Sequence, residues 1–163
     1  MHLQETSMNR RTMLTLAAAS IAAPTSGAIA EDSPDIDGVK AASNAFYTTL
    51  DVLDDGTAMA GVWAQTAYVT YVGPQSKLII VGWDAQKKYW ADFNKRFSKR
   101  NVSLIDVHIH VNGNLAWEIG AETGQAFMAD GTTRKIDWLV TNVYEKIGGR
   151  WLIVSHHVQP KPQ

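Results

Sequence analysis

The spacing of apolar residues predicts helices in the first half of the chain and strands in the second. Between Ile36 and Leu53, apolar side chains recur every three to four residues, which favours an amphipathic helix ending at Asp54. A second, short helix is expected over 57–63 and a third over about 83–99. Short strands are expected at 68–72 and 78–81, where β-branched and aromatic residues precede turn residues.

Long alternating segments fill the rest of the chain. The expected strands cover 102–111, 115–127, 134–146 and 150–158. Turn dipeptides separate them, namely Asn112-Gly113, Asp130-Gly131 and Gly148-Gly149. Helices followed by an antiparallel meander predict an α+β fold in which one curved sheet wraps around the helices. The concave face of such a sheet leaves a cavity wherever the helix side chains do not fill it.

The first thirty residues have the pattern of a bacterial twin-arginine export signal. Arg10 and Arg11 precede a small-residue apolar run, and Ala28-Ile29-Ala30 stands before the acidic Glu31. The apolar run is too short to cross a bilayer, which needs about 20 apolar residues. We therefore expect residues 1–30 to be removed, leaving a single domain over 31–163. The mature protein is expected in the periplasm or outside the cell, with no membrane partner after cleavage.

Composition excludes several classes of function. The 163 residues carry a formal net charge of −1 and show no basic stripe, so no nucleic-acid partner is expected. The chain has no cysteine, and it lacks a dinucleotide-binding glycine motif and a phosphate loop, so no cofactor is expected. Six tryptophans indicate either a large core or a cavity lined by aromatic side chains.

Short motifs in the expected order of elements carry a resemblance to a known family. They are Phe46–Asp54, Trp63 with Tyr68–Val72, Gly82, and the final segment Arg150–His157. On these, the chain resembles the SnoaL-like proteins of the NTF2-like superfamily. The strand 107–113 is also similar to the association domain of calcium/calmodulin-dependent kinase, a member of the same superfamily. The resemblance implies an NTF2-like (cystatin-like) cone, with three N-terminal helices packed on one strongly curved, mostly antiparallel sheet.

The functional residues of that superfamily are not all present. It includes isomerases, cyclases, dehydratases and assembly modules, so the fold does not fix the chemistry. Thr141 and the Tyr68–Tyr71 region stand where ketosteroid isomerases carry acidic residues. Arg134 matches one pocket arginine of the kinase association domain, but Thr123 and Asn142 stand where others would be. These departures favour a ligand-binding protein over a ketosteroid isomerase.

Strand alternation supplies a candidate catalytic pair. If the face of 150–158 that carries His157 and the face of 134–146 that carries Asp137 both point into the cone, the two side chains can meet. A histidine oriented by a carboxylate is a competent general base, and Tyr71 would act as proton donor. The alternative is a rim histidine and a surface aspartate.

Aromatic and small polar residues are candidates for the pocket wall. They are Tyr47, Trp63, Trp90, Trp117, Thr123, Thr141 and Ser155. Core packing would explain most of the aromatic ones equally well. His108 and His110 share one strand face, and the apolar face of that strand is expected to be the concave one. We therefore expect the two histidines at a subunit interface and no metal site, although a His-x-His pair can bind zinc.

Three function classes remain open from the sequence. The first is an exported protein with an apolar pocket for a small organic ligand. The second is an isomerase, cyclase or dehydratase that uses the His157–Asp137 acid–base pair and no cofactor. The third is a dimerisation or assembly module. The resemblance also implies a homodimer formed through the outer face of the sheet.

Overall fold

The computed structural model describes residues 33–162, so the export signal expected at 1–30 lies outside the described residues. The described part begins with helix α1 (Pro34–Leu50), the 3-10 turn η1 (Ala58–Gly61), strands β1 (Thr70–Val72) and β2 (Ile80–Val81), and helix α2 (Trp83–Asn94). Four long strands complete it: β3 (Phe97–Asn112), β4 (Leu115–Met128), β5 (Thr133–Ile147) and β6 (Arg150–Pro160).

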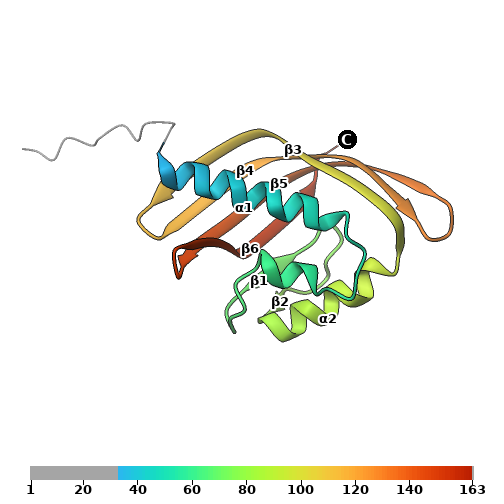
Figure 1. Ribbon diagram of the computed structural model, residues 1–163. Helices are drawn as coiled ribbons and strands as arrows, with labels where there is room; N and C mark the ends of the chain where they lie inside the picture. Colours follow the sequence, from blue (N-terminus) through green and yellow to red (C-terminus); the bar gives the residue numbers. More distant parts are fainter. Residues whose placement is uncertain (1–32, 163) are drawn as a thin grey trace, which may run out of the picture.

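All six strands form one curved sheet in the order β2-β1-β6-β5-β4-β3. Every neighbouring pair is antiparallel except β1 and β6, which run parallel. Helix α1 crosses the concave face, while α2 lies with β1 and β2 beside one end of it (Figure 1). The expected α+β fold with one curved, mostly antiparallel sheet is therefore confirmed, and the sheet remains open.

The expectation of three helices is wrong. The segment 57–63 forms only the single 3-10 turn η1. A segment this short cannot repay the cost of nucleating an α-helix. The side chain of Asp54 holds the turn instead, by accepting hydrogen bonds from the backbone N–H groups of Gly56 and Ala58 at 2.9 and 2.8 Å. The third expected helix is also shorter, because β3 already begins at Phe97.

Helix α1 has strong start signals and an apolar inner face. Ser33 caps it by accepting a hydrogen bond from the N–H of Ile36 at 3.2 Å, and Pro34 occupies its first turn. Phe46 from this helix is fully buried and packs edge-on against Trp63, with ring centroids 6.2 Å apart. This contact anchors the helix over the sheet and leaves its polar inner residues facing the strands.

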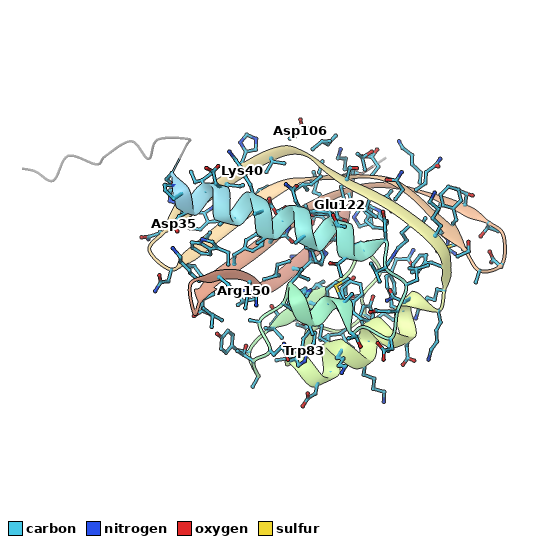
Figure 2. All side chains as sticks on the ribbon, in the orientation of Figure 1. Asp35, Lys40, Trp83, Asp106, Glu122 and Arg150 are labelled. Atoms are coloured by element: carbon cyan, nitrogen blue, oxygen red, sulfur yellow. The ribbon has the colours of Figure 1, made fainter. Side chains whose placement is uncertain are left out.

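A bulge in β3 reverses which side chains face inward. Pairing with β4 shifts between Ile105 and His108, and Asp106 takes a positive φ of 53°. Asp106 lies on the outer side of this bend (Figure 2). Before the bulge Val102 faces inward, and after it Val111 does. The expectation that one apolar face runs along the whole strand is therefore wrong, because an inserted residue moves the alternation to the other face.

A second bulge does the same in β6. Val143 pairs with Ser155, but the next residue, Tyr144, pairs with Ile153, so Val154 is the extra residue. Ile153 faces inward before the bulge, and His156 faces inward after it. The bulge thus puts His156 in the interior in place of His157, which is exposed.

Gly124 lies where β4 passes very close to the backbone of β3. Its φ is +143°, and a Cβ there would meet the backbone carbonyl of Asn101 on β3.

We expect Gly124→Ala to lower the free energy of unfolding by about 3 kcal/mol or more, the upper end of ordinary substitutions. The control is Gly131→Ala, because Gly131 has a positive φ of +85° but open space around it. This substitution should lower the free energy of unfolding by only about 1 kcal/mol. Urea unfolding followed by tryptophan fluorescence compares the two, and equal losses would contradict the steric argument.

Candidate functional site

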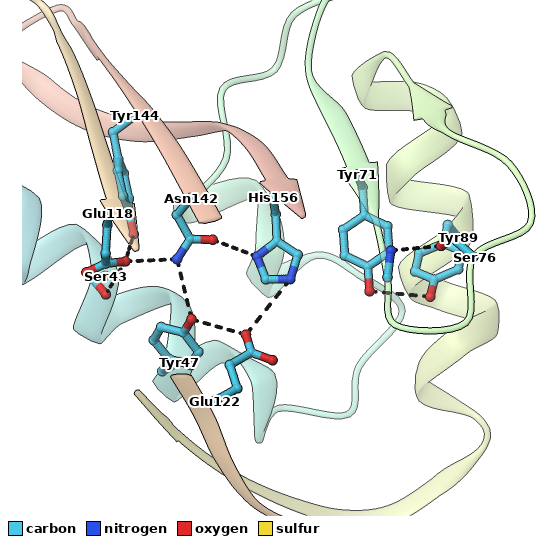
Figure 3. A network of polar contacts seen from close by, with 11 residues as sticks. Ser43, Tyr47, Tyr71, Ser76, Tyr89, Glu118, Glu122, Asn142, Tyr144 and His156 are labelled. Carbon is cyan, nitrogen blue, oxygen red and sulfur yellow. Dashed lines mark hydrogen bonds and ion pairs between the residues drawn. The ribbon is translucent and has the colours of Figure 1, made fainter. Parts of the chain in front are cut away.

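A row of four side chains crosses the concave face of the sheet, one from each of four adjacent strands. Glu118 of β4 pairs in register with Asn142 of β5, Asn142 with His156 of β6, and His156 with Tyr71 of β1. All four are at least nine-tenths buried. We call these residues the polar row (Figure 3). Because cross-strand neighbours share a face, the register alone brings them together.

Glu118 closes one end of the row by accepting three hydrogen bonds on a single oxygen. Its Oε2 receives the hydroxyl of Ser43 from α1 at 3.0 Å, the amide of Asn142 at 2.8 Å and the hydroxyl of Tyr144 at 2.8 Å. The three donors converge on one acceptor oxygen, so each of these buried groups has a partner. Burial of this acid is thereby offset by hydrogen bonds.

Asn142 links Glu118 to His156 through hydrogen bonds. Its Nδ2 donates to Glu118, so its Oδ1 is the atom that faces Nδ1 of His156 at 2.7 Å. An amide oxygen can only accept, which assigns the proton of the neutral imidazole to Nδ1. Nε2 of His156 is then a free lone pair on the other side of the ring.

A second carboxyl group lies opposite that lone pair. Oε1 of Glu122 is 3.9 Å from Nε2 of His156 and accepts a hydrogen bond from the hydroxyl of Tyr47 at 3.1 Å. Glu122 stands four residues beyond Glu118 on the same face of β4. The ring of His156 is held by Tyr71, stacked at 5.3 Å, and by Phe46 at 5.2 Å.

Burial pushes both members of this pair towards their uncharged forms. It raises the pKa of Glu122 to about 7, with the hydrogen bond from Tyr47 acting in the opposite direction. It lowers the pKa of His156 to about 3, and the neighbouring His157 adds to that effect. The 3.9 Å separation is within ion-pair range, but the desolvation of both groups outweighs their attraction. At neutral pH, His156 is a neutral base and Glu122 is close to half ionised.

These groups line a small inner chamber. Its volume is about 50 Å³, and its wall includes Glu122, His156, Tyr71, Trp90 and Arg100. Since one water needs at least about 10–15 Å³, the chamber holds a few water-sized groups. Burial raises the pKa of Tyr71 well above its usual range, so its hydroxyl remains a proton donor.

A wider vestibule of about 610 Å³ adjoins the chamber, and we call the two spaces together the tunnel. The two spaces share six wall residues: Pro74, Phe93, Phe97, Ala126, Ile136 and Trp138. A separate groove of about 1040 Å³ runs between α1 and β3, and Ser43, Tyr47 and Glu118 line it. Acid–base groups at the inner end of an apolar tunnel are the usual arrangement of a site that binds a small organic molecule.

Arg100 brings a positive charge to the same chamber. It is 3% exposed, donates to Oδ1 of Asn94 at 2.8 Å and lies over the ring of Phe97 at 4.9 Å. Burial lowers its pKa to about 10, so it stays charged at neutral pH. Within residues 33–162, no carboxylate lies within ion-pair distance of its guanidinium.

The pair expected from the sequence does not meet inside the cone. His157 is exposed as a result of the bulge at Val154. Asp137 lies at the surface, where it forms ion pairs with Lys161 at 2.9 Å and Lys135 at 3.1 Å. The expected inward orientation of both side chains is therefore wrong. Both faces of β5 carry apolar residues, so alternation could not decide which one points inward.

The expected pocket residues divide between the two faces of the sheet. Tyr71 and Trp90 line the chamber, Tyr47 donates to Glu122, and Trp63 is fully buried in the core. The others lie on the outer face, opposite the polar row: Trp117, Thr123, Thr141 and Ser155. For these four, the expectation that they face the pocket is wrong.

His108 and His110 are exposed, as expected from the sequence, and His110 packs against Trp117 with ring centroids 4.3 Å apart. Within the described residues, no group of three His, Asp or Glu side chains has the geometry of a metal site. Neither helix in that part of the chain is long and apolar enough to cross a membrane.

Comparison with known families now identifies the architecture. The profile of the SnoaL-like domain matches residues 39–159, which include every residue of the polar row. The chain belongs to the SnoaL-like family. A comparison with curated proteins gave no significant match.

Solved structures agree with this SnoaL-like assignment. A protein from Streptomyces avermitilis, assigned as a dehydratase of the NTF2-like family, is 21% identical, with a TM-score of 0.71 over 79% of this chain and 98% of its own. An NTF2-like protein from Salmonella enterica is 23% identical, with a TM-score of 0.71 over 78% and 91%. A protein from Thiobacillus denitrificans, assigned as a calcium/calmodulin-dependent protein kinase type II association domain, is 25% identical, with a TM-score of 0.63 over 76% and 94%. These likenesses establish the NTF2-like fold.

Sequence reasoning missed Glu118, Glu122, Asn142, His156 and Arg100 as site residues. One signal was available, because Glu118 and Glu122 stand four residues apart on one face of a strand that is otherwise apolar and small. Two carboxyl groups on the concave face of a SnoaL-like sheet would have indicated a buried acid. The position of His156 had no comparable signal, since it depends on the bulge.

The raised pKa of Glu122 predicts a specific dependence of stability on pH. The folded protein keeps a proton that the unfolded chain loses between about pH 4.5 and pH 7, so stability falls as pH rises through this window. Relative to Glu122→Gln, the wild type should lose up to about 3 kcal/mol of unfolding free energy between pH 4.5 and pH 8. Because His156 is present in both proteins, its opposite contribution, which is lost as pH falls from about 6.5 towards about 3, largely cancels.

Urea unfolding at several pH values measures this difference. The surface carboxyl of Asp137, whose pKa is lowered by Lys161 and Lys135, provides the control, and Asp137→Asn should not remove the loss above pH 5. A constant difference between wild type and Glu122→Gln from pH 4.5 to pH 8 would contradict the raised pKa.

Proposed function

We propose that this SnoaL-like protein binds a small, mostly apolar organic molecule in the tunnel and moves a proton on it with its own side chains. The observation that carries the proposal is the pair formed by Glu122 and His156 at the inner end of the tunnel. A general acid–base group is most effective when its pKa lies near the working pH, and burial brings that of Glu122 to about 7.

Each group has a separate role in this proposal. Ionised Glu122 removes a proton from the bound molecule, and its protonated form returns one to another atom. Tyr47 orients Oε1 of Glu122, while His156 stays neutral and keeps its Nε2 lone pair beside the carboxyl group. The hydroxyl of Tyr71 stabilises the oxygen on which negative charge develops. Isomerisation, dehydration and cyclisation all require this transfer, and the relative from Streptomyces avermitilis is assigned as a dehydratase.

Two other readings are compatible with parts of the structure. A ligand-binding protein without catalysis would use the same tunnel but would not need Glu122 to change its charge. An assembly module would need no tunnel, and the chamber and vestibule count against it. The buried, titrating carboxyl group therefore favours catalysis over the first expectation from sequence, which was binding alone.

A neutral carbon acid tests the proposal without knowledge of the natural substrate. When a base removes the ring C–H proton of 5-nitrobenzisoxazole, the C–H electron pair forms the nitrile and the N–O bond breaks, leaving a coloured phenolate. We expect wild type to accelerate this reaction over buffer, with a rate that rises with pH through about 7. The rate with Glu122→Gln should be at least about 100-fold lower, which is the lower end of general-base contributions.

The matched control is Asp137→Asn, which removes a surface carboxyl and should keep the full rate. Equal rates for wild type and Glu122→Gln would reject catalysis by this carboxyl group. Binding of the compound without turnover would assign the tunnel to ligand storage or transport.

We also propose that the mature protein is an exported homodimer that associates through the outer sheet face. Large apolar side chains are exposed there, namely Ile105, Leu115, Trp117, Ile119 and Leu139. Exposed apolar surface of this kind marks interaction sites. Trp117 belongs to this exposed apolar surface and pairs in register with His110 and Val143.

Native mass spectrometry of the protein purified from periplasm tests both parts. We expect a dimer that begins near residue 31, and Trp117→Lys should convert it to a monomer because a buried charge without a partner is unfavourable. Lys40→Glu on α1, away from that face, is the control. A monomeric wild type, or a dimer that survives Trp117→Lys, would contradict association through this face.

A further inference from the structure

Arg100 is a buried cation without an ion-pair partner in the described part of the chain, and Asp51 acts on its charge only from beyond ion-pair distance. Its neighbours are the neutral amide of Asn94 and the rings of Phe93 and Phe97. Its Nε is buried and has no hydrogen-bond partner. A guanidinium that is 3% exposed and has no carboxylate within ion-pair distance is unfavourable in an empty site, because burial of a charge must be offset by a partner.

The guanidinium belongs to the wall of the inner chamber rather than to the core. Arg100 lines the chamber together with Glu122, His156 and Tyr71. A group bound there can reach the cation and the proton-transferring pair within the same 50 Å³. That volume fits a carboxylate or an enolate oxygen, but it does not fit a whole organic molecule.

The wall of the vestibule is positively charged, like Arg100 in the chamber. Lys77, Arg96, Arg134 and Lys135 line it, and no aspartate or glutamate does. Only Lys135 forms an ion pair, with Asp137 at 3.1 Å, among the ion pairs of residues 33–162. Cations around an apolar passage attract anions and increase their rate of association.

The rest of the passage is apolar and aromatic. Tyr89, Phe93, Phe97, Met128 and Trp138 line the vestibule, and Phe93 stacks on Tyr89 with centroids 5.1 Å apart. Such a wall binds a flat apolar body by burying its surface. The charge of the ligand thus belongs at the inner end and its hydrophobic body in the vestibule.

We propose that the molecule bound in this tunnel is an organic anion with an apolar, planar body, whose carboxylate or enolate oxygen pairs with Arg100. The proposal rests on the tunnel being the binding site of the proposed function. It adds the substrate class and makes Arg100 the residue that selects it. In a proton-transfer reaction the same guanidinium would stabilise the negative charge that forms when Glu122 takes a proton.

The test uses 4-fluorobenzoate and its neutral analogue 4-fluorobenzamide, whose binding is followed by fluorine NMR at pH 7. We expect wild type to bind the anion at least about tenfold more tightly than the amide, since charge-assisted pairs are the stronger ones. Arg100→Gln should remove this preference, because it weakens binding of the anion and leaves binding of the amide unchanged. Arg100→Lys should retain part of the preference. Arg150→Gln is the control, because Arg150 donates to the carbonyl of Gly61 at the surface.

Each outcome separates this proposal from the acid–base proposal. Equal binding of the two compounds, or an unchanged affinity for the anion in Arg100→Gln, overturns the anion proposal even if 5-nitrobenzisoxazole is still turned over through Glu122. Preference for the anion that depends on Arg100, without any turnover, leaves the anion proposal standing and rejects proton transfer. If Arg100→Gln does not fold, Arg100→Lys carries the test, since it keeps the charge but loses the planar guanidinium. An Arg100→Lys protein with the wild-type affinity for both compounds would then overturn the role of a guanidinium.

Discussion

The rest of the site depends on the hydrogen bond between Asn142 and His156. Its direction is determined by Glu118, which accepts a hydrogen bond from Nδ2 of Asn142, so that the amide oxygen faces the imidazole. That oxygen fixes the tautomer and turns the free lone pair of His156 towards Glu122. A buried polar chain is stable only when every member has a partner. Helix α1 completes the chain by supplying Ser43 to Glu118 and Tyr47 to Glu122.

The two ends of this network have different environments, which gives the two carboxyl groups different properties. Glu118 receives three hydrogen bonds and sits beside the wide groove under α1. Glu122 receives one from Tyr47 and faces a chamber of about 50 Å³. One strand therefore carries two buried acids four residues apart, and burial raises the pKa of Glu122 to about 7. A carboxyl group whose surroundings bring its pKa near neutral is characteristic of acid–base sites.

Periodicity and turn chemistry predicted most of the fold. The four long strands lie where alternation and the Asn112-Gly113 turn placed them, and α1 lies where its apolar spacing and Ser33 indicate. The site was less predictable, because two single-residue bulges decide which histidine faces inward and which half of β3 is concave. A bulge leaves little trace in the sequence, and one residue changes every later side chain to the other face. Tyr71 and Trp90 were found because they lie on elements without a bulge.

The central claim is that Glu122 titrates near neutral pH inside the folded protein. Isotope-edited infrared spectroscopy of protein labelled with carbon-13 at glutamate side chains measures this directly, by following the carbonyl band of the protonated acid against pH. The account predicts one band that disappears with a midpoint of about 7 and is absent from Glu122→Gln. A spectrum in which every glutamate loses its proton near the ordinary value of about 4.3 would contradict it.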